Sequence, residues 1–426
     1  MIKKEVVFTG IGVISPIGIG VETYWTSLLE SRSGIGFLQS LEVFQARRPM
    51  GAEVTGFKPK EYFRSKKDVK QIKVMSRDIQ LAFAAAMLAC TDAGLRTGET
   101  DRNVDPDRLG ISFGADLIGL ELPELLDAFR AGIQGGQYDF TTWGNAAMEK
   151  IFPLWMLKYL PNMPACHIGI AHDARGPNNS LTLQRGASLA AILEAVRLLE
   201  RGAADVMICG GYGNCINPSF LARAKTHKFV DTAVDPVVDP ASQPRPFDAD
   251  RRGTLPGEGA AVFILETREF AQARGAKIYA KVSGFCSRTD PKSGGTGIQQ
   301  AIRGALYDAD LTPDDIGHVN ADGLGTLVED AVEAKAIHAE LGDIPVTSFK
   351  GHFGSLGSGT GAVELVGSLL SLQHGLVPPT RNCERIAPDC PINVVQGKPL
   401  PTKSTTALKL NTALGGRTFA LVVTNS

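Results

Sequence analysis

The stretch GPNNSLTLQRGASLAAILEAVRLLERGAADVMICGG, residues 176–211, decides the fold. Its pattern predicts a Gly-Pro turn, a short buried segment, a tight corner at Gln184-Arg185-Gly186, an amphipathic helix and a buried strand. Such a corner presents one side chain at a helix N-terminus, where backbone N–H groups and the helix dipole favour a nucleophile or an anion. The residue presented here is Arg185. The sequence therefore raises the question of what an arginine does at this corner.

The composition is that of a globular protein with many tight turns. The chain has 426 residues, a net charge of −1, 43% hydrophobic residues and 47 glycines. This balance gives no indication of a nucleic-acid partner or an anionic membrane surface. No apolar run approaches the roughly 18 residues of a membrane span. The N-terminal run MIKKEVVFTGIGVISPIG contains Gly, Pro and β-branched residues, which favour a buried first strand over a signal peptide.

The cysteines indicate a reducing compartment. There are seven, scattered and mostly within apolar runs, so we expect no disulfide framework and a cytoplasmic location. Neither a CxxC pair nor an HExxH motif occurs, so we expect no metal site and no cofactor.

Buried strands alternate with amphipathic helices in two similar βαβα series, which predicts an α/β architecture with parallel strands. The two predicted halves are residues 1–265 and 266–426, and a partly helical excursion at 115–165 is apolar enough to cover a site or a subunit interface. Strands are expected at 6–13, 109–114, 260–265, 278–285, 316–321, 344–348, 405–410 and 419–424, and helices at 21–29, 79–92, 297–309, 328–341 and 362–374.

One concentration of basic residues precedes the helix at 79–92. It comprises Arg64, Lys66, Lys67, Lys70, Lys73 and Arg77. The two interpretations are a solvated helix face and a docking patch for an acidic partner.

Several motifs along nearly the whole chain resemble the elongating β-ketoacyl-acyl carrier protein synthases of the thiolase superfamily. They are VVFTGIGVISPIG, LPNM, the Gly176-Pro177 pair, ADVMICGG, RPFD, GEGAA, GAKIYA, VNADGLGT, Asp330 with Glu333, and VPPT, in the family's order. The resemblance implies a thiolase-like fold with five layers, α-β-α-β-α. It also implies an acyl-accepting cysteine at the corner and two histidines that assist decarboxylation and stabilise the oxyanion.

Residues of other types stand at all three of these positions. Counting from Gly176 and from Asp205 places Arg185 at the cysteine position, directly after Gln184. Asp322 and Ser355 stand at the two histidine positions, and the family's lysine and glutamate are matched by Lys350 and Glu364. A one-residue local shift would exchange Gln184 for Arg185, and a redrawn loop would bring in His352.

Two interpretations of Arg185 stay open at this point. An arginine–carboxylate pair with Asp322 would fill the cavity without chemistry, or Arg185 would bind an anionic ligand such as a carboxylate. The family's substrate-binding positions fall at Gln184, Thr326, Leu414 and Gly415, and its aromatic gate is missing from the segment 412–416.

The sequence thus predicts a divergent family member that lacks the Cys-His-His triad and has lost condensation. The first hypothesis is a non-condensing partner or acyl-binding subunit in fatty acid or polyketide metabolism, as a homodimer or as a heterodimer with a competent ketosynthase. In it, Arg64, Lys66, Lys67, Lys70 and Lys73 are a possible contact for acyl carrier protein. The alternatives are an active 3-oxoacyl-carrier-protein synthase, malonyl decarboxylase or hydrolase with a rearranged site, and a free-standing acyl- or carboxylate-binding protein.

Overall fold

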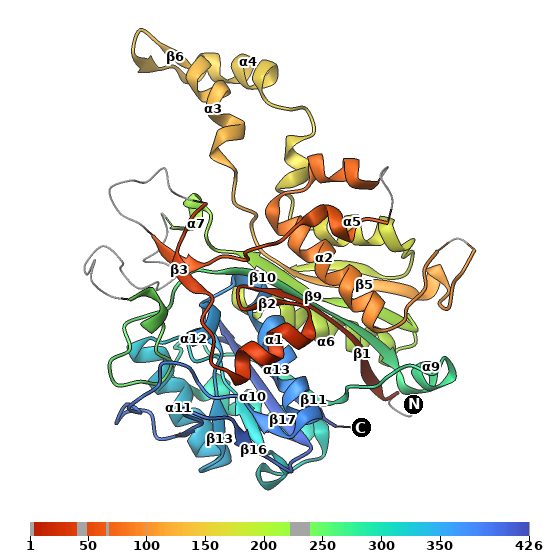
Figure 1. The fold of residues 1–426 in the computed structure, drawn as a ribbon, viewed down its shortest axis with the longest axis vertical. Helices are drawn as coiled ribbons and strands as arrows, with labels where there is room; N and C mark the ends of the chain where they lie inside the picture. The colour runs from red at the N-terminus through yellow and green to blue at the C-terminus, as the bar shows by residue number, and fades with distance from the viewer. Residues whose placement is uncertain (1–3, 41–48, 65–67, 99, 222–238, 426) are drawn as a thin grey trace.

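The structure, a computed structural model, describes residues 4–40, 49–64, 68–98, 100–221 and 239–425, and contains two similar halves (Figure 1). Each half holds a five-stranded sheet with the same order of antiparallel and parallel neighbours. In the first half the order is β1 (Val6–Ser15), β10 (Glu258–Thr267), β9 (Val206–Asn214), β5 (Leu109–Ala115) and β8 (Asn178–Thr182). In the second half it is β11 (Ala280–Thr289), β18 (Arg417–Thr424), β17 (Thr406–Ala413), β12 (His318–Asn320) and β13 (Pro345–Thr347), with β15 (Asn393–Val394) beyond.

The two sheets meet where β1 pairs with β11 over Val7–Lys281 and Phe8–Ala280. Of the remaining short strands, β2 (Gly18–Ile19) pairs with β1, and the others form three two-stranded sheets. These sheets are β3 (Ile35–Phe37) with β4 (Met50–Ala52), β6 (Ile133–Gln134) with β7 (Gln137–Tyr138), and β14 (Leu376–Val377) with β16 (Leu400–Pro401).

The predicted five-layered α-β-α-β-α arrangement is confirmed. Helices α6 (Ala187–Glu200) and α13 (Thr360–His374) lie between the two sheets. The outer layers are α2 (Arg77–Asp92) with α5 (Met163–His172) and, on the other side, α10 (Thr296–Ala309) with α11 (Leu327–Leu341). Other helices are α1 (Val21–Leu29), α3 (Leu122–Ala131), α4 (Phe140–Lys150), α7 (Pro218–Leu221), α9 (Arg268–Ala273) and α12 (Lys350–Phe353).

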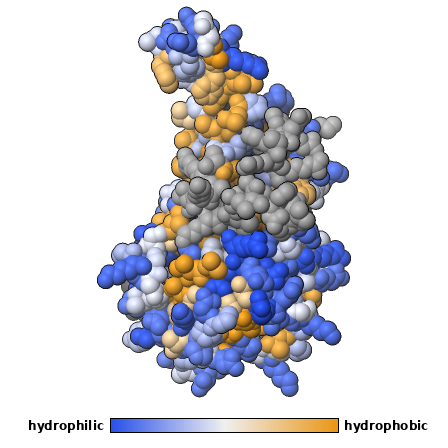
Figure 2. Space-filling view, turned by 90° about the vertical axis from the view of Figure 1, so that its left-hand side faces the viewer, coloured by the Kyte–Doolittle hydropathy of each residue, from blue (hydrophilic) through white to orange (hydrophobic). Residues whose placement is uncertain are grey.

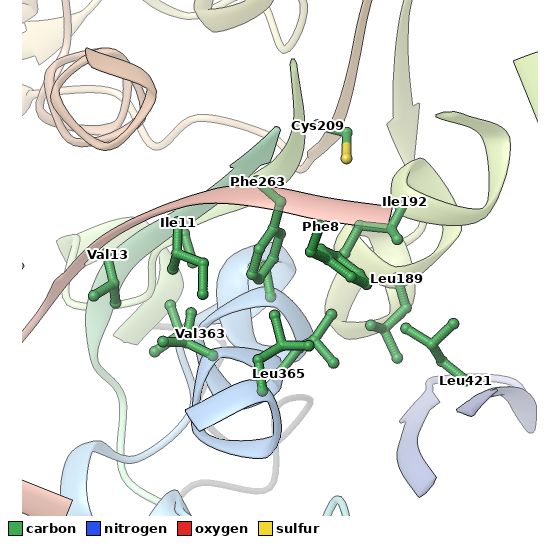
Figure 3. Close-up of a cluster of buried hydrophobic side chains, with 14 of the residues drawn as sticks. Phe8, Ile11, Val13, Leu189, Ile192, Cys209, Phe263, Val363, Leu365 and Leu421 are labelled. Carbon is green, nitrogen blue, oxygen red and sulfur yellow. The ribbon is translucent and has the colours of Figure 1, made fainter. Parts of the chain in front are cut away.

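The central layer follows from the composition of its two helices. Eleven of the 14 residues of α6 and 13 of the 15 residues of α13 are buried. A helix that is apolar on all sides is stable only when both of its faces are covered. Figure 3 shows the result, in which Leu189 and Val363 from these helices meet Phe8 of β1 and Leu421 of β18 in one core.

Glycines allow α6 to begin directly against the strands. A Cβ at Gly114 would lie 2.3 Å from the backbone nitrogen of Ser188, and one at Gly211 would lie 2.6 Å from the Ser188 side chain. Gly114 lies near the end of β5 and Gly211 lies within β9, so the start of α6 packs closely against both strands.

Two expectations were wrong. The sheets are mixed rather than parallel, because β9 and β10 are antiparallel, as are β17 and β18. The second pair is joined by a tight turn without a crossover helix, which dictates antiparallel strands. The short segment before the corner is not buried, because it is β8, which ends the sheet and leaves Asn178 and Asn179 exposed.

The predicted excursion forms an arm that projects from the body of the molecule (Figure 1). It contains α3, the β6–β7 hairpin and α4, and an aromatic cluster holds its tip together, with the Phe129 and Trp143 rings 4.5 Å apart. Hydrophobic residues gather along it (Figure 2), among them Phe140 and Met148, which are 82% and 86% exposed. Among all described helices, none combines the length and apolar character needed to cross a membrane.

Candidate functional site

Arg185 lies at the corner that the sequence predicts. The short 3₁₀ turn η5 (Gln184–Gly186) joins β8 to α6, and Gln184 takes a positive φ of 52° to make the bend. The Gln184 side chain is exposed, whereas Arg185 is only 9% exposed. The Arg185 Nε donates a hydrogen bond of 3.3 Å to the carbonyl oxygen of Thr412, near the end of β17.

Asp322 follows β12 and has its carboxylate fully engaged. Its Oδ1 accepts hydrogen bonds from the Lys350 ammonium at 2.6 Å and from the Asn411 amide at 2.9 Å. Its Oδ2 accepts from the Thr412 hydroxyl at 2.6 Å. Among the ion pairs of the described residues, Asp322 is paired with Lys350 and not with Arg185. The predicted Arg185–Asp322 plug is therefore not formed, because these nearer donors already occupy the carboxylate.

Lys350 and Asp322 belong to a chain of buried charges of alternating sign. Lys350 also binds Glu364 at 2.9 Å, and Glu364 binds Lys409 at 2.7 Å. The side chains of Lys350, Glu364 and Lys409 are fully buried. Two carboxylates and two ammonium groups thus compensate one another without water.

The shifts in pKa follow from these pairings. Burial opposes the charge of Asp322, but Lys350 and then Arg185 outweigh it and hold the pKa of Asp322 below its usual range. Burial likewise opposes the charge of Lys350, and Asp322 and Glu364 together raise its pKa. For Lys409, burial is the largest effect and its pKa is lowered despite the contact with Glu364.

Two further carboxylates hold the loop that carries Asp322. The two oxygens of Glu333 accept hydrogen bonds from the backbone N–H groups of Asp322 and Gly323, each at 2.8 Å. Asp330 accepts from the backbone N–H groups of Gly325 at 2.9 Å and Phe247 at 2.8 Å. Burial raises the pKa of both groups, that of Asp330 to about 6. The loop is therefore fixed by its own α11 helix.

Ser355 lies beside Arg185 at a cavity of about 20 Å³. The residues around this cavity are Asp116, Gln184, Arg185, Cys215, Phe220, Ser355, Gly357 and Leu414. A space of this size holds about one water molecule. His352 does not reach it, since its Nδ1 lies 2.9 Å from the Arg32 carbonyl oxygen and its Nε2 lies 3.4 Å from that of Pro379.

A larger cavity of about 290 Å³ opens on the other side of Arg185. Both polar and aliphatic residues line it. The lining residues are Arg185, Asp290, Lys292, Ser293, Gly295, Ile298, Asp322, Leu324, Val328, Glu329, Val332, Glu333, Thr412, Ala413, Leu414, Gly415, Gly416 and Thr418.

The site residues expected from the sequence are thus divided among three places. Leu414 and Gly415 line the larger cavity, whereas Thr326 lines neither cavity and donates its hydroxyl to Glu329 at 2.6 Å. Lys350 and Glu364 lie behind Asp322. No cluster of His, Cys, Asp and Glu suited to a metal ion occurs among the described residues.

Of the basic residues before α2, Arg64, Lys70 and Lys73 are exposed. Arg64 also donates a hydrogen bond to the Thr97 hydroxyl at 3.1 Å, and Arg77 is paired with Glu258 at 2.8 Å. Lys66 and Lys67 lie outside the described residues.

Lys409 and Asn411 are site residues that the sequence analysis missed. Both stand in the strand TALKLNTA of β17, at alternate positions to the buried Leu408 and Leu410. A lysine in an otherwise apolar buried strand requires a charged partner. The lysine in this apolar strand could therefore have predicted a carboxylate on a neighbouring element.

Comparisons with known proteins identify the family of this chain. Residues 3–271 match the family model "Beta-ketoacyl synthase, N-terminal domain", and residues 273–384 match "Beta-ketoacyl synthase, C-terminal domain". The chain is 33% identical to a 3-oxoacyl-[acyl-carrier-protein] synthase 2 of Synechocystis sp., over 98% of this chain and 97% of the relative. It is 31% identical to the tetracenomycin polyketide synthase ketoacyl synthase alpha subunit of Streptomyces glaucescens, over 99% and 97%. A solved structure described as the ishigamide ketosynthase/chain length factor has a TM-score of 0.85 and 27% identity, with both chains covered completely.

This chain is therefore a member of the β-ketoacyl synthase family and has its thiolase-like fold. By their names, one relative is a 3-oxoacyl-[acyl-carrier-protein] synthase and the other is a ketoacyl synthase subunit of a polyketide synthase.

Proposed function

We propose that this protein is a non-condensing member of its family that acts as the partner subunit of a competent ketosynthase. The observation that carries the proposal is the pair of charges at the corner. A buried arginine stands where the family places its acyl-accepting cysteine, and an ion-paired carboxylate stands where it places a histidine.

Neither group can perform the chemistry of the residue it replaces. An arginine side chain is not deprotonated in proteins and forms no acyl-enzyme. The condensation needs hydrogen-bond donors at the developing oxyanion. The Asp322 carboxylate is negative and would repel that charge, and Lys350 is already held between Asp322 and Glu364.

Among the residues that the structure describes, Ser355 lacks the adjacent histidine base that would make it a replacement nucleophile. A serine needs an adjacent base to be activated. No histidine lines either cavity within the described part of the chain, and the space beside Ser355 is too small for an acyl chain. The fold is kept, but the groups that hold and activate the acyl chain are absent from these positions.

The surface supports association through the first half of the molecule. Strand β8 ends the sheet with exposed residues, and an exposed sheet edge is a template for pairing with another chain. Ile170 on α5, the helix that packs beside β8, is 71% exposed. We therefore infer a subunit interface that joins β8, α5 and the arm of each subunit.

We also propose a contact with an acyl carrier protein, at a surface other than the subunit interface. Lys70 and Lys73 are exposed on the 3₁₀ segment Asp68–Val74 before α2 and would attract an acidic carrier protein.

Co-expression with a ketosynthase that has the full Cys-His-His triad tests the partner role. We expect the two chains to co-purify as a one-to-one complex, and Ile170→Asp to reduce the recovered complex at least tenfold. Tyr307→Asp is the matched control, because Tyr307 is 89% exposed on α10 in the outer layer of the other half. Separate elution of the two chains, or equal losses with both variants, would contradict the proposal.

A further inference from the structure

The larger cavity is lined by a buried cation, Arg185, for which the described residues provide no direct ion pair. Arg185 is 9% exposed and lines the cavity, and a guanidinium group has five N–H donors. One hydrogen bond, from Nε to the Thr412 carbonyl oxygen, engages it within the described part of the chain. No ion pair of the described residues includes Arg185, so its charge is not neutralised by a direct contact with a carboxylate.

The carboxylates that line the cavity accept hydrogen bonds from groups other than Arg185. Asp322 is held by Lys350, Asn411 and Thr412. Glu333 accepts two backbone N–H groups, and Glu329 accepts the Thr326 hydroxyl. Asp290 accepts hydrogen bonds from the Thr296 hydroxyl at 2.8 Å and from the backbone N–H groups of Lys292 at 3.1 Å and Gly294 at 3.0 Å.

The charge balance leaves Arg185 without a carboxylate in direct contact, although it lies close enough to Asp322 to lower the pKa of that carboxylate. The chain Asp322–Lys350–Glu364–Lys409 contains two negative and two positive groups and is internally compensated. A buried charge is expected to find a partner of opposite sign. An arginine fork binds a carboxylate with two parallel hydrogen bonds.

Part of the cavity lining is aliphatic, and polar residues such as Lys292, Ser293 and Glu329 also line it. Ile298 and Val332 come from α10 and α11, and Leu324 comes from the loop after β12. Val328 is 66% exposed, which places it at the mouth of the cavity. The volume of about 290 Å³ is near the lower end of the range for small-ligand pockets.

We propose that this cavity binds an aliphatic monocarboxylic acid, with the carboxylate on the Arg185 guanidinium and the alkyl chain against Ile298, Leu324 and Val332. The inference does not depend on the partner role proposed above, because it concerns the single chain. Binding of such a ligand would neutralise Arg185 and fill the cavity.

Isothermal titration calorimetry of the purified protein with hexanoate tests this site. Hexanamide is the matched neutral ligand, since it keeps the chain and loses the negative charge. We expect hexanoate to bind at least tenfold more tightly than hexanamide and Arg185→Gln to abolish this preference. Lys292→Gln, an exposed cation at the same cavity, should change the hexanoate affinity less than twofold.

A second measurement covers the case in which Arg185→Gln does not fold. Hexanoate should slow the modification of Arg185 by phenylglyoxal in the wild-type protein, as followed by peptide mass spectrometry, and hexanamide should not. Equal binding of the two ligands, no binding of hexanoate, or unchanged modification of Arg185 would overturn the proposal.

Discussion

At the scale of single residues, the site is organised by Lys350. Its ammonium group lies between Asp322 at 2.6 Å and Glu364 at 2.9 Å and is fully buried. Such a pair adds little stability over a well-packed apolar core, but removing one member leaves a buried charge without compensation. Lys350 is thus needed to compensate the buried charges of Asp322 and Glu364, whether or not the protein has catalytic activity.

Lys350→Met is expected to destabilise the protein by about 3–5 kcal/mol, because it leaves Asp322 with a buried negative charge. Urea unfolding followed by circular dichroism measures the change. Lys335→Met on the exposed face of α11 is the control and should stay within about 0.5 kcal/mol of the wild type. Similar losses in the two variants would show that the charge chain is not coupled to stability.

At the scale of elements, the start of α2 carries a buried acid. Asp78 is 6% exposed, and burial, followed by the neighbouring Glu258, raises its pKa to about 7. The folded protein therefore keeps a proton on Asp78 at pH values where the unfolded chain, with a pKa of about 3.9, has released it.

The stability should consequently fall as the pH rises from about 4 to 7, with a slope from this group of up to about 1.4 kcal/mol per pH unit. Asp78→Asn should remove this contribution, so that its free energy of unfolding falls less between pH 5 and pH 7 than that of the wild type. Asp343→Asn, on an exposed loop, is the control. Parallel pH profiles for the wild type and Asp78→Asn would contradict the assignment.

Element positions were predictable where the pattern is local. The helix expected at 21–29 is α1, and the corner expected at 184–186 is η5. The exposure of β8 was not predictable, because it depends on β8 being last in the sheet and not on its own residues. The burial of Asp78 also depends on a distant contact, since Glu258 lies 180 positions further along the chain.

At the scale of the whole molecule, the family motifs gave the five layers and the positions of Arg185, Asp322 and Ser355, but not which charges pair. Arg185 and Asp322 are near each other, as expected, yet Lys350 and Asn411 reach the carboxylate first. That outcome is decided by the register of β17 beside β12, which brings Lys409 against Asn320 and sets Asn411 two residues further along β17. The domain boundary at residues 265 and 266 stays a prediction.

In our proposal, this chain therefore keeps the fold of its family and lacks the catalytic chemistry. The corner, the central helices and the loop held by Asp330 and Glu333 have the geometry described above. In this proposal, Arg185, Asp322 and Ser355 stand at the positions of the nucleophile and the two imidazoles. The central claim is that this protein forms no acyl-enzyme.

Intact-protein mass spectrometry after incubation with an acyl-loaded carrier protein tests this claim most directly. We predict that the mass of the protein is unchanged, while a ketosynthase with the full triad gains one acyl group under the same conditions. A stable gain of one acyl mass, located by peptide mapping to Ser355 or to another residue of the site, would contradict the account.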